Sequence, residues 1–316
     1  MKPSKKQFDL VCVGGATVDI SFYSKEGELI PAGGNAKQKM LAFEYGSKIV
    51  ADRVYTTCGG GAANCSVGAA RLGLKTAAIV KIGDDSNGQI IAKNLKDNKV
   101  STELIKLDPQ ASSGFSVILT IDNPAKEHIA FIHRGANSKL SAKDIATAPT
   151  DWYYVTSLPS DSWQEIMSKL VKIGKNIVWN PGNEQLKDIP AIKKFLPHIK
   201  LLMVNHLEAL EFRKLKDVKG LLVHLHSFGP KLVVITDGAS GAYAFDGKKY
   251  YFMKATSKKV INTLGVGDAF GSGLTSALIY DKNLKDALSW GIKNSASVVG
   301  EIGAQAGLLT KKQIEK

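Results

Sequence analysis

Two glycines and an aspartate near the C-terminus form the segment with the clearest capacity for chemistry. Residues 262–270 read NTLGVGDAF, and an amphipathic helix is expected directly after them, over 269–279. Unpaired amides at a helix start, aided by the positive end of the helix dipole, bind phosphate and other anions. A carboxylate at Asp268 would face that anion site and could accept the proton of an attacking hydroxyl in phosphoryl transfer. The alternative is that Asp268 only caps the helix, a position that aspartate favours.

A second glycine-rich segment, GGGAAN at residues 59–64, leads into a helix expected over 62–72. Its glycines permit a tight turn close to a ligand, and Asn64 offers a hydroxyl both a donor and an acceptor. Asp19 follows the first expected strand at its carboxyl end, the edge at which open α/β sheets bind ligands. Asp19 and Asn64 are therefore candidates for holding sugar hydroxyls. A local role at the helix start is the alternative for Asn64.

Two further strand ends carry polar residues that suit a nucleotide and its metal. The stretch NHLE at 205–208 follows a strand expected over 201–204, and a helical spacing of three places Asn205 and Glu208 on one face. Oxygen ligands of this kind suit a hydrated Mg²⁺ ion. The turn TDGASG at 236–241 follows another expected strand, as a glycine-rich turn beside a nucleotide would. An ordinary surface position is the alternative for Glu208.

The elements that must position these residues alternate along the chain. Apolar runs rich in β-branched residues alternate with amphipathic stretches, which indicates βαβ units on a mostly parallel sheet. Strands are expected at residues 8–13, 77–82, 152–155, 177–179, 201–204 and 232–236. Helices are expected at residues 62–72, 88–98, 162–173, 208–215, 269–279 and 285–299.

Two intervals break this alternation. Residues 20–57 are rich in glycine and charge, and residues 114–132 alternate apolar and polar side chains as an antiparallel hairpin does. Both flank the edge at which a parallel sheet presents its ligand crevice. We therefore expect these intervals to form a small β-sheet lid over the site.

The composition excludes several classes of protein. The chain has 316 residues, 44% of them hydrophobic and 22% charged, which is typical of a soluble globular protein. No apolar run approaches the roughly 18 residues of a membrane span, so we expect no membrane partner. The three cysteines include no CxxC pair, which argues against a disulfide framework or a zinc knuckle and favours a reducing, cytoplasmic compartment.

The positive charge of the chain does not indicate a nucleic-acid partner. The net charge of +13 arises from 38 lysines and 4 arginines against 29 acidic residues. The lysines are scattered, and arginine, on which sequence-specific nucleic-acid readers rely, is scarce. We expect a solvated lysine-rich surface that attracts anionic substrates, and no nucleic-acid partner.

Other nucleotide and hydrolase motifs are absent. The P-loop pattern GxxxxGK[ST] has no match, and GxGxxG fails because residues 59–64 end in Asn and residues 265–270 end in Phe. The sequence also lacks HExxH and GxSxG. A P-loop enzyme and a Rossmann-type dehydrogenase are therefore disfavoured.

Together, the motifs resemble those of the PfkB family of carbohydrate kinases, over nearly the whole chain. GGGAAN matches the family's N-terminal motif, NTLGVGDAF resembles its DTxGAGD motif, and residues 205–208 match its NxxE, all in the family's order. The resemblance implies a single ribokinase-like domain over residues 1–316. That domain would be a three-layer α/β sandwich with a mostly parallel central sheet, plus a β-sheet lid from about 20–57 and 114–132.

The resemblance also implies the roles of individual residues in a kinase that uses ATP and Mg²⁺. Asp268 would be the catalytic base, beside an anion hole of backbone amides. The remaining roles fall into three sets: anion-hole amides of Gly265, Val266 and Gly267; acceptor-binding Asp19, Gly60 and Asn64; and cofactor-binding Asn205, Glu208 (on Mg²⁺, through water), Thr236, Gly238 and Gly241.

Many members of the family also bind a monovalent cation such as K⁺ beside the anion hole. That site would map to Asn262, Leu264 and the backbone around Gly303. Asn262 replaces the family's usual aspartate, which keeps an oxygen but removes a negative charge. The glutamate with which ribokinases contact ribose has no match after the strand near Val155, so the acceptor need not be free ribose.

We therefore expect an ATP-dependent kinase that phosphorylates a primary hydroxyl of a sugar or sugar-like acceptor. The nearest alternative is a nucleoside kinase, in which Phe43 or Phe115 of the lid would stack on the base. The alternative from another class is a non-catalytic regulator that binds a sugar or nucleotide on the same fold. Lids of this family often pair, so a homodimer through the lid is a further expectation.

Overall fold

The computed structural model describes residues 7–32, 35–121 and 128–316, with side chains described outside 31–39. Its centre is a nine-stranded sheet in which seven neighbouring strands run parallel and two more are added at one edge by antiparallel pairing. The strands, in spatial order, are β17 (Tyr250–Met253), β16 (Ala242–Phe245), β15 (Leu232–Thr236), β14 (Leu201–Asn205), β13 (Asn176–Trp179), β12 (Trp152–Val155), β1 (Leu10–Val13), β6 (Thr76–Ile79) and β8 (Val100–Ser101).

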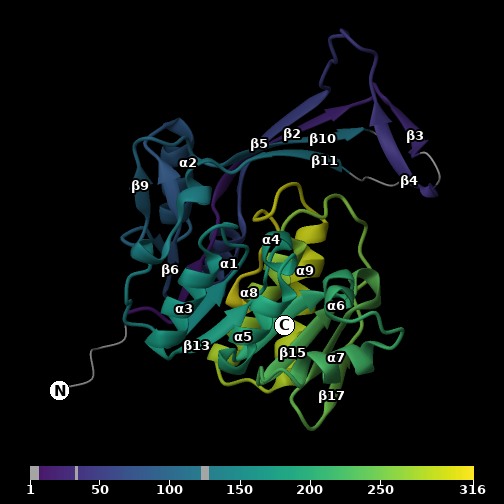
Figure 1. Ribbon diagram of the computed structural model, residues 1–316. Coiled ribbons are helices and arrows are strands. Elements are labelled where there is room, and N and C mark those ends of the chain that lie inside the picture. The colour runs from purple at the N-terminus through teal and green to yellow at the C-terminus, as the bar shows by residue number, and fades with distance from the viewer. Residues whose placement is uncertain (1–6, 33–34, 122–127) are drawn as a thin grey trace.

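Helices cover both faces of this sheet, and each face has its own apolar core (Figure 1). Strand β1 shows the alternation that makes this possible: Leu10 and Cys12 belong to one core, and Val11 and Val13 to the other. The first core holds α1 (Gly61–Arg71), α2 (Ser86–Asp97), α8 (Val266–Ile279), α9 (Leu284–Val299) and α10 (Lys311–Ile314). The second holds α3 (Trp163–Ile173), α4 (Asn183–Leu186), α5 (Ile189–Phe195), α6 (His206–Phe212) and α7 (Val218–His226).

A second sheet extends from this α/β body, and we call it the lid sheet (Figure 1). Its strands, in spatial order, are β11 (His128–His133), β10 (Phe115–Ile121), β2 (Thr17–Ser24) and β5 (Arg53–Gly59). Two smaller sheets pair β3 (Glu28–Ala32) with β4 (Asn35–Ala42), and β7 (Lys81–Gly83) with β9 (Lys106–Asp108). Short 3₁₀ helices lie at Gly135–Lys139, Ala142–Asp144, Leu196–His198 and Gly238–Ser240.

Most expected elements are present, two expectations need correction, and one edge of the central sheet was not expected. The antiparallel hairpin expected within 114–132 is confirmed as β10 and β11. The strand expected over 77–82 is wrong: β6 ends at Ile79 and β7 begins at Lys81 in a different sheet. The helix expected over 208–215 begins two residues earlier, because Asn205 caps it. The antiparallel edge, β16 and β17, was not expected at all.

Within the described residues, no helix combines the length and the apolar character that crossing a membrane requires.

Candidate active site

Asp268 lies in the first turn of α8, three residues after the cap. Gly265 is the N-cap residue, with a φ of 68°, and no side chain forms a cap hydrogen bond there. Among the described residues, the backbone N–H groups of Gly267 and Asp268 have no hydrogen-bond partner. The alternative that Asp268 merely caps the helix is therefore wrong, and the helix start remains open to an anion.

The two glycines of this turn serve different needs. A Cβ at Gly265 would lie 2.3 Å from the Cβ of Ala304, so this position must be glycine for the loop after α9 to pack against it. A Cβ at Gly267 would meet no atom within 4 Å. Gly267 therefore borders open space where a side chain would stand, and its amide has no partner among the described residues.

Helix α1 brings Asn64 directly onto Asp268. Asn64 Nδ2 donates to Asp268 Oδ2 over 2.8 Å, and the Cys65 thiol donates to the Asp268 carbonyl oxygen over 3.6 Å. One turn further along both helices, a Cβ at Gly68 would lie 2.4 Å from Ser272 Oγ. Because Gly68 lacks that atom, the two helices approach closely enough for the Asn64–Asp268 hydrogen bond to form.

The environment of Asp268 favours its protonated form. Burial raises the pKa of the Asp268 carboxyl, the hydrogen bonds from Asn64 and Cys65 lower it, and the negative charge of Asp19 raises it further. The net pKa lies above the ordinary aspartate value of 3.8. A carboxylate with a raised pKa is a stronger base, and the effect of Asp19 places two carboxylates in one site.

Asp19 was expected at the carboxyl end of β1, and it lies inside strand β2 of the lid sheet, the next strand along the chain. The hydroxyls of Thr17 and Ser116 donate to its Oδ1 over 2.9 and 2.7 Å. Its Oδ2 accepts no hydrogen bond from the described residues and is available to a ligand. Burial raises the pKa of Asp19, and the two hydroxyl groups lower it.

Gly60 closes the start of α1 against the connection between β1 and β2. It has a φ of 88°, and a Cβ there would lie 2.6 Å from the Gly15 carbonyl oxygen. That carbonyl oxygen accepts from the amides of Ala62 and Ala63 over 3.1 and 3.3 Å. The N-terminal amides of α1 are thus partly occupied, and α8 offers the more open of the two helix starts.

Asn205 and Glu208 form a reciprocal cap at the start of α6. Asn205 Oδ1 accepts from the Glu208 amide, and Glu208 Oε2 accepts from the Asn205 amide, both over 2.8 Å. Asn205 is the last residue of β14, so the expectation that both residues share one helical face is wrong. Burial raises the pKa of the Glu208 carboxyl. Both residues line a groove of about 370 Å³.

The turn after β15 lies beside this cap. Thr236 pairs with Asn205 in the parallel register, and His206 Nδ1 lies 3.1 Å from Asp237 Oδ1. Gly238 has a φ of 50° and open space around it, whereas a Cβ at Gly241 would lie 2.1 Å from the Met253 carbonyl oxygen. The five residues expected to bind the cofactor therefore gather at the carboxyl ends of β14 and β15. In the described part of the chain, no hydrogen bond joins them to Asp268.

The residues expected at the monovalent-cation site lie on two segments that touch. Asn262 is buried, and its Oδ1 accepts from the Leu264 amide over 2.6 Å. Gly303 has a φ of 90°, and a Cβ there would lie 2.8 Å from the Thr57 side chain. The side-chain oxygen of Asn262 therefore stabilises its own loop. Over residues 7–32, 35–121 and 128–316, no group of three or more His, Cys, Asp or Glu side chains is placed to hold a metal ion.

Three residues of the site did not emerge from the sequence. Gln305 Nε2 donates to Asn64 Oδ1 over 2.9 Å, Ser116 donates to Asp19, and Cys65 contacts Asp268. Cys65 adjoins Asn64 in the GGGAAN helix, which was a usable signal. Gln305 and Ser116 lie in segments without a motif, and only the fold brings them to the site.

Sugar and nucleoside kinases are similar to this chain along nearly its whole length, both in sequence and in solved structures. The 5-dehydro-2-deoxygluconokinase of Bacillus subtilis is 25% identical, over 99% of this chain and 96% of that protein. A ribokinase of Arabidopsis thaliana complexed with ribose and ATP superposes with a TM-score of 0.81 at 20% identity, covering 98% of this chain and 97% of that one. The nucleoside kinase of Methanocaldococcus jannaschii gives 0.79 at 20% identity, with 99% and 98% covered.

These structures confirm the ribokinase-like α/β fold. The family model of the pfkB family carbohydrate kinases matches residues 8–311. Carbohydrate kinases of this family transfer a phosphoryl group to an alcohol group of a sugar. This supports a phosphotransferase over the non-catalytic regulator. The chain belongs to the pfkB family of carbohydrate kinases.

Proposed function

We propose that this sugar kinase uses ATP and Mg²⁺ to phosphorylate a primary hydroxyl of a sugar or sugar-like acceptor, with Asp268 as the general base. One arrangement carries the proposal. Asp268 lies between the open amides at the start of α8 and the polar side chains of Asn64 and Asp19. A phosphoryl group and a hydroxyl could therefore meet at this carboxylate.

The chemical step then follows from the positions of these groups. Asp268 accepts the proton of the acceptor hydroxyl, and the oxygen forms a bond to the γ-phosphorus. The bond from that phosphorus to the β–γ bridging oxygen breaks, and ADP leaves with the electron pair. The Gly267 and Asp268 amides, with the dipole of α8, stabilise the charge on the transferred group.

The acceptor side needs hydrogen-bonding groups that are still available. Asp19 Oδ2 is free of hydrogen bonds from the described residues, and Asn64 retains one of its two Nδ2–H donors. A polyol fits such a pair, because each hydroxyl both donates and accepts. Gly60 supports this site by allowing the close approach of α1 to Gly15.

We assign the phosphates and the metal to the cofactor-binding residues at the carboxyl ends of β14 and β15. Glu208 keeps one carboxylate oxygen free of the cap and faces the groove beside Asn205, which suits a hydrated Mg²⁺ ion held through water. Mg²⁺ supplies charge neutralisation on the phosphates when bound. Thr236, Gly238 and Gly241 would form the floor for the nucleotide.

The residues at the candidate K⁺ site fit a cation less well. The Asn262 oxygen already accepts from the Leu264 amide, and no carboxylate replaces the missing negative charge at that position. We therefore expect turnover without added K⁺.

A nucleoside acceptor is the second candidate, favoured by one feature of the lid sheet. A cavity of about 340 Å³ is lined by Phe22, Phe43, Ile49, Leu119 and Phe131, together with polar residues. Aromatic rings of this kind can stack on a purine base. Neither Phe115 nor any residue of the catalytic group lines that cavity.

A coupled ADP-release assay with ATP and Mg²⁺ tests the proposal and names the acceptor. The panel comprises ribose, fructose, 2-keto-3-deoxygluconate, hexose phosphates and nucleosides, each with and without K⁺. Turnover with one sugar supports the proposal, and turnover with nucleosides alone supports the second candidate. ATP binding without turnover on any acceptor would contradict both.

A further inference from the structure

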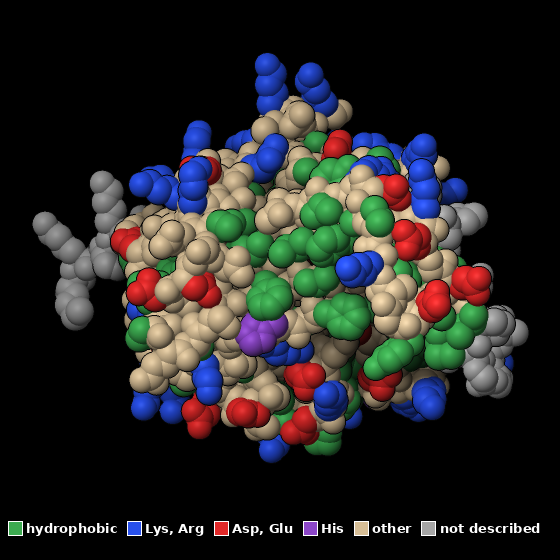
Figure 2. Space-filling view, turned by 90° about the horizontal axis from the view of Figure 1, so that it is seen from above, with side chains coloured by type: hydrophobic (Ala, Val, Ile, Leu, Met, Phe, Trp, Pro, Cys, Tyr) green, Lys and Arg blue, Asp and Glu red, His purple; other side chains and the backbone are tan. Residues whose placement is uncertain are grey.

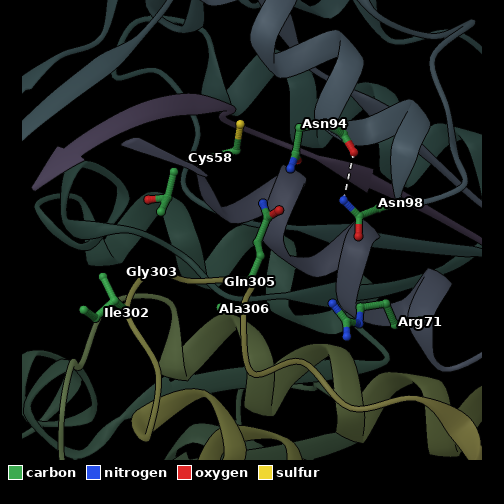
Figure 3. Close-up of a pocket in the computed structure, with 9 residues that line it drawn as sticks. Cys58, Arg71, Asn94, Asn98, Ile302, Gly303, Gln305 and Ala306 are labelled. Atoms are coloured by element: carbon green, nitrogen blue, oxygen red, sulfur yellow. Dashed lines mark hydrogen bonds between the residues drawn. The ribbon is translucent and has the colours of Figure 1, made fainter. Parts of the chain in front are cut away.

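A polar pocket of about 260 Å³ lies beside the candidate active site without including its catalytic residues (Figure 3). It is enclosed by the C-terminal halves of α1 and α2, by the end of β5, and by the loop after α9. The residues that line it are Thr57, Cys58, Arg71, Asn94, Asn98, Ile302, Gly303, Gln305 and Ala306. Asp19, Asn64 and Asp268 are not among them.

Three residues that line this pocket each carry a buried polar side-chain atom with no hydrogen-bond partner among the described residues. These atoms are Arg71 Nε, Asn94 Oδ1 and Gln305 Oε1. The described part of the chain holds seven such side-chain atoms, so these three form a concentration in one place. An unsatisfied buried polar group destabilises the fold, and such a group usually pairs with a ligand or with water.

The orientation of Gln305 is fixed by the active site. Asp268 can only accept from Asn64 Nδ2, so Asn64 Oδ1 must accept from a donor, and Gln305 Nε2 is that donor. Gln305 Oε1 is therefore directed away from Asn64 and requires a donor from the pocket. Figure 3 shows the Gln305 side chain extending from its loop into the space near Cys58, Asn94 and Asn98.

Arg71 requires the opposite kind of partner. It is half-buried in the last turn of α1, its Nε is fully buried, and it forms no ion pair or hydrogen bond with any described residue. No aspartate or glutamate lines the pocket. A guanidinium without a carboxylate partner is a binding group for a carboxylate or phosphate.

We propose that this pocket is a second ligand site, for a small anion that also carries hydroxyl groups. The anionic group pairs with Arg71, and the hydroxyls donate to Gln305 Oε1 and Asn94 Oδ1. The volume lies just below the roughly 300–1,000 Å³ of pockets for drug-sized ligands, which suits a sugar acid and excludes a nucleotide.

The site is connected to the candidate catalytic centre without being part of it. Asn64 and Arg71 lie seven residues apart on one face of α1, about 10 Å along the helix. Gln305 lines the pocket and donates a hydrogen bond to Asn64, so it links the pocket to the candidate catalytic centre. A ligand in the pocket would therefore hold the amide that orients the partner of Asp268.

Calorimetric titration of the full chain with D-gluconate, without ATP, tests the proposal independently of kinase activity. D-sorbitol is the matched probe that lacks the carboxylate. The pocket variants are Arg71→Gln and the isosteric Asn94→Asp, and the control is Lys96→Gln, which removes a positive charge from an exposed position on the same helix as Asn94. Asp19→Ala disables the acceptor site instead.

The proposal predicts that gluconate binds one site per chain and that sorbitol binds at least about tenfold more weakly, as expected for the loss of a charge-assisted hydrogen bond. Arg71→Gln and Asn94→Asp should each weaken gluconate binding by a similar factor, while Lys96→Gln and Asp19→Ala leave it unchanged. Thermal melts identify a variant that fails to fold. If one pocket variant fails, gluconate binding by the other tests the proposal. Loss of binding in Asp19→Ala alone, equal binding by all variants, or no binding by the wild type would each overturn the proposal.

Discussion

The side-chain amide of Asn64 donates a 2.8 Å hydrogen bond to the carboxylate of Asp268, across 204 residues of sequence. This contact joins the first turns of α1 and α8, the two helices that follow the glycine-rich motifs. The Cys65 thiol lies 3.9 Å from the other carboxylate oxygen, Oδ1. The proposed base is thereby oriented before any substrate binds.

Removing the charge of Asp268 should stabilise the fold at neutral pH. The folded-state pKa of Asp268 is raised, so the native state keeps this proton to higher pH than the unfolded state does. Stability is therefore lost as pH rises from the ordinary value near 3.8 through the folded-state pKa, and the loss is complete above it. Thermal melts should show Asp268→Asn melting above the wild type at pH 7, with the difference vanishing at acidic pH. A lower melting temperature for the variant at pH 7 would contradict this.

The two glycines of the α8 turn should respond differently to alanine. Gly265→Ala forces a Cβ onto Ala304 at a positive φ, where an L-residue costs about 1–2 kcal/mol before any clash. The melting temperature should fall. Gly267→Ala meets no atom, so the fold should persist while the new methyl group weakens ATP binding at the open amides. Equal melting temperatures for the two variants would contradict this prediction, because they would mean that the loop after α9 moves away from a Cβ at residue 265.

Glu208→Gln separates the capping role of this residue from its proposed role at the metal. Glutamine can still accept from the Asn205 amide. Because burial raises the pKa of the Glu208 carboxyl, removing its charge should not lower the melting temperature at pH 7. The loss of charge should raise the Mg²⁺ concentration needed for half-maximal turnover, by about 10–100-fold for a residue acting through water. Glu211→Gln, an exposed position lining the same groove, is the control and should have no effect. An unchanged Mg²⁺ dependence in Glu208→Gln would show that Glu208 caps α6 and does not act on the metal.

The lid sheet should hold two copies of the chain together. Hydrophobic side chains gather on the face seen from above in Figure 2, and such a patch is typical of an interaction surface. Phe131 and Ile132 of the edge strand β11 are 64% and 65% exposed, on opposite faces of the lid sheet. Light scattering should give a dimer for the wild type and a monomer for Phe131→Ser. Phe252→Ser, at a similarly exposed phenylalanine of β17, should remain dimeric; a monomeric wild type would contradict the expectation.

The sequence predicted those parts of the fold that depend on local pattern. Strands such as β15 and helices such as α3 follow from apolar runs and amphipathic spacing, and both are present. The division at Val80 could not be predicted, because the run from Ala77 to Ile82 is apolar except for Lys81 and the two strands are told apart by their pairing partners. The edge strands β16 and β17 likewise depend on long-range pairing.

The candidate site was predictable only where a motif marks it. Asp268 and Asn64 emerged from glycine-rich segments, whereas Gln305 lies in a loop that carries no signal until Gly265 and Ala304 are seen in contact. The strand that carries Asp19 was not predicted, because β2 begins at Thr17, ahead of the interval 20–57 that was expected to form the lid. Side chains brought together by packing, such as Ser116 and Asp19, have no counterpart in local spacing.

The central claim is that Asp268 removes the acceptor proton, and the turnover of Asp268→Asn tests it most directly. The measurement is the rate of ADP release with saturating ATP, Mg²⁺ and the acceptor identified in the panel, for a variant whose circular dichroism matches the wild type. Loss of a general base predicts a fall in kcat of about 10²–10⁴-fold with little change in ATP binding. A kcat within about tenfold of the wild type would show that Asp268 is not the base.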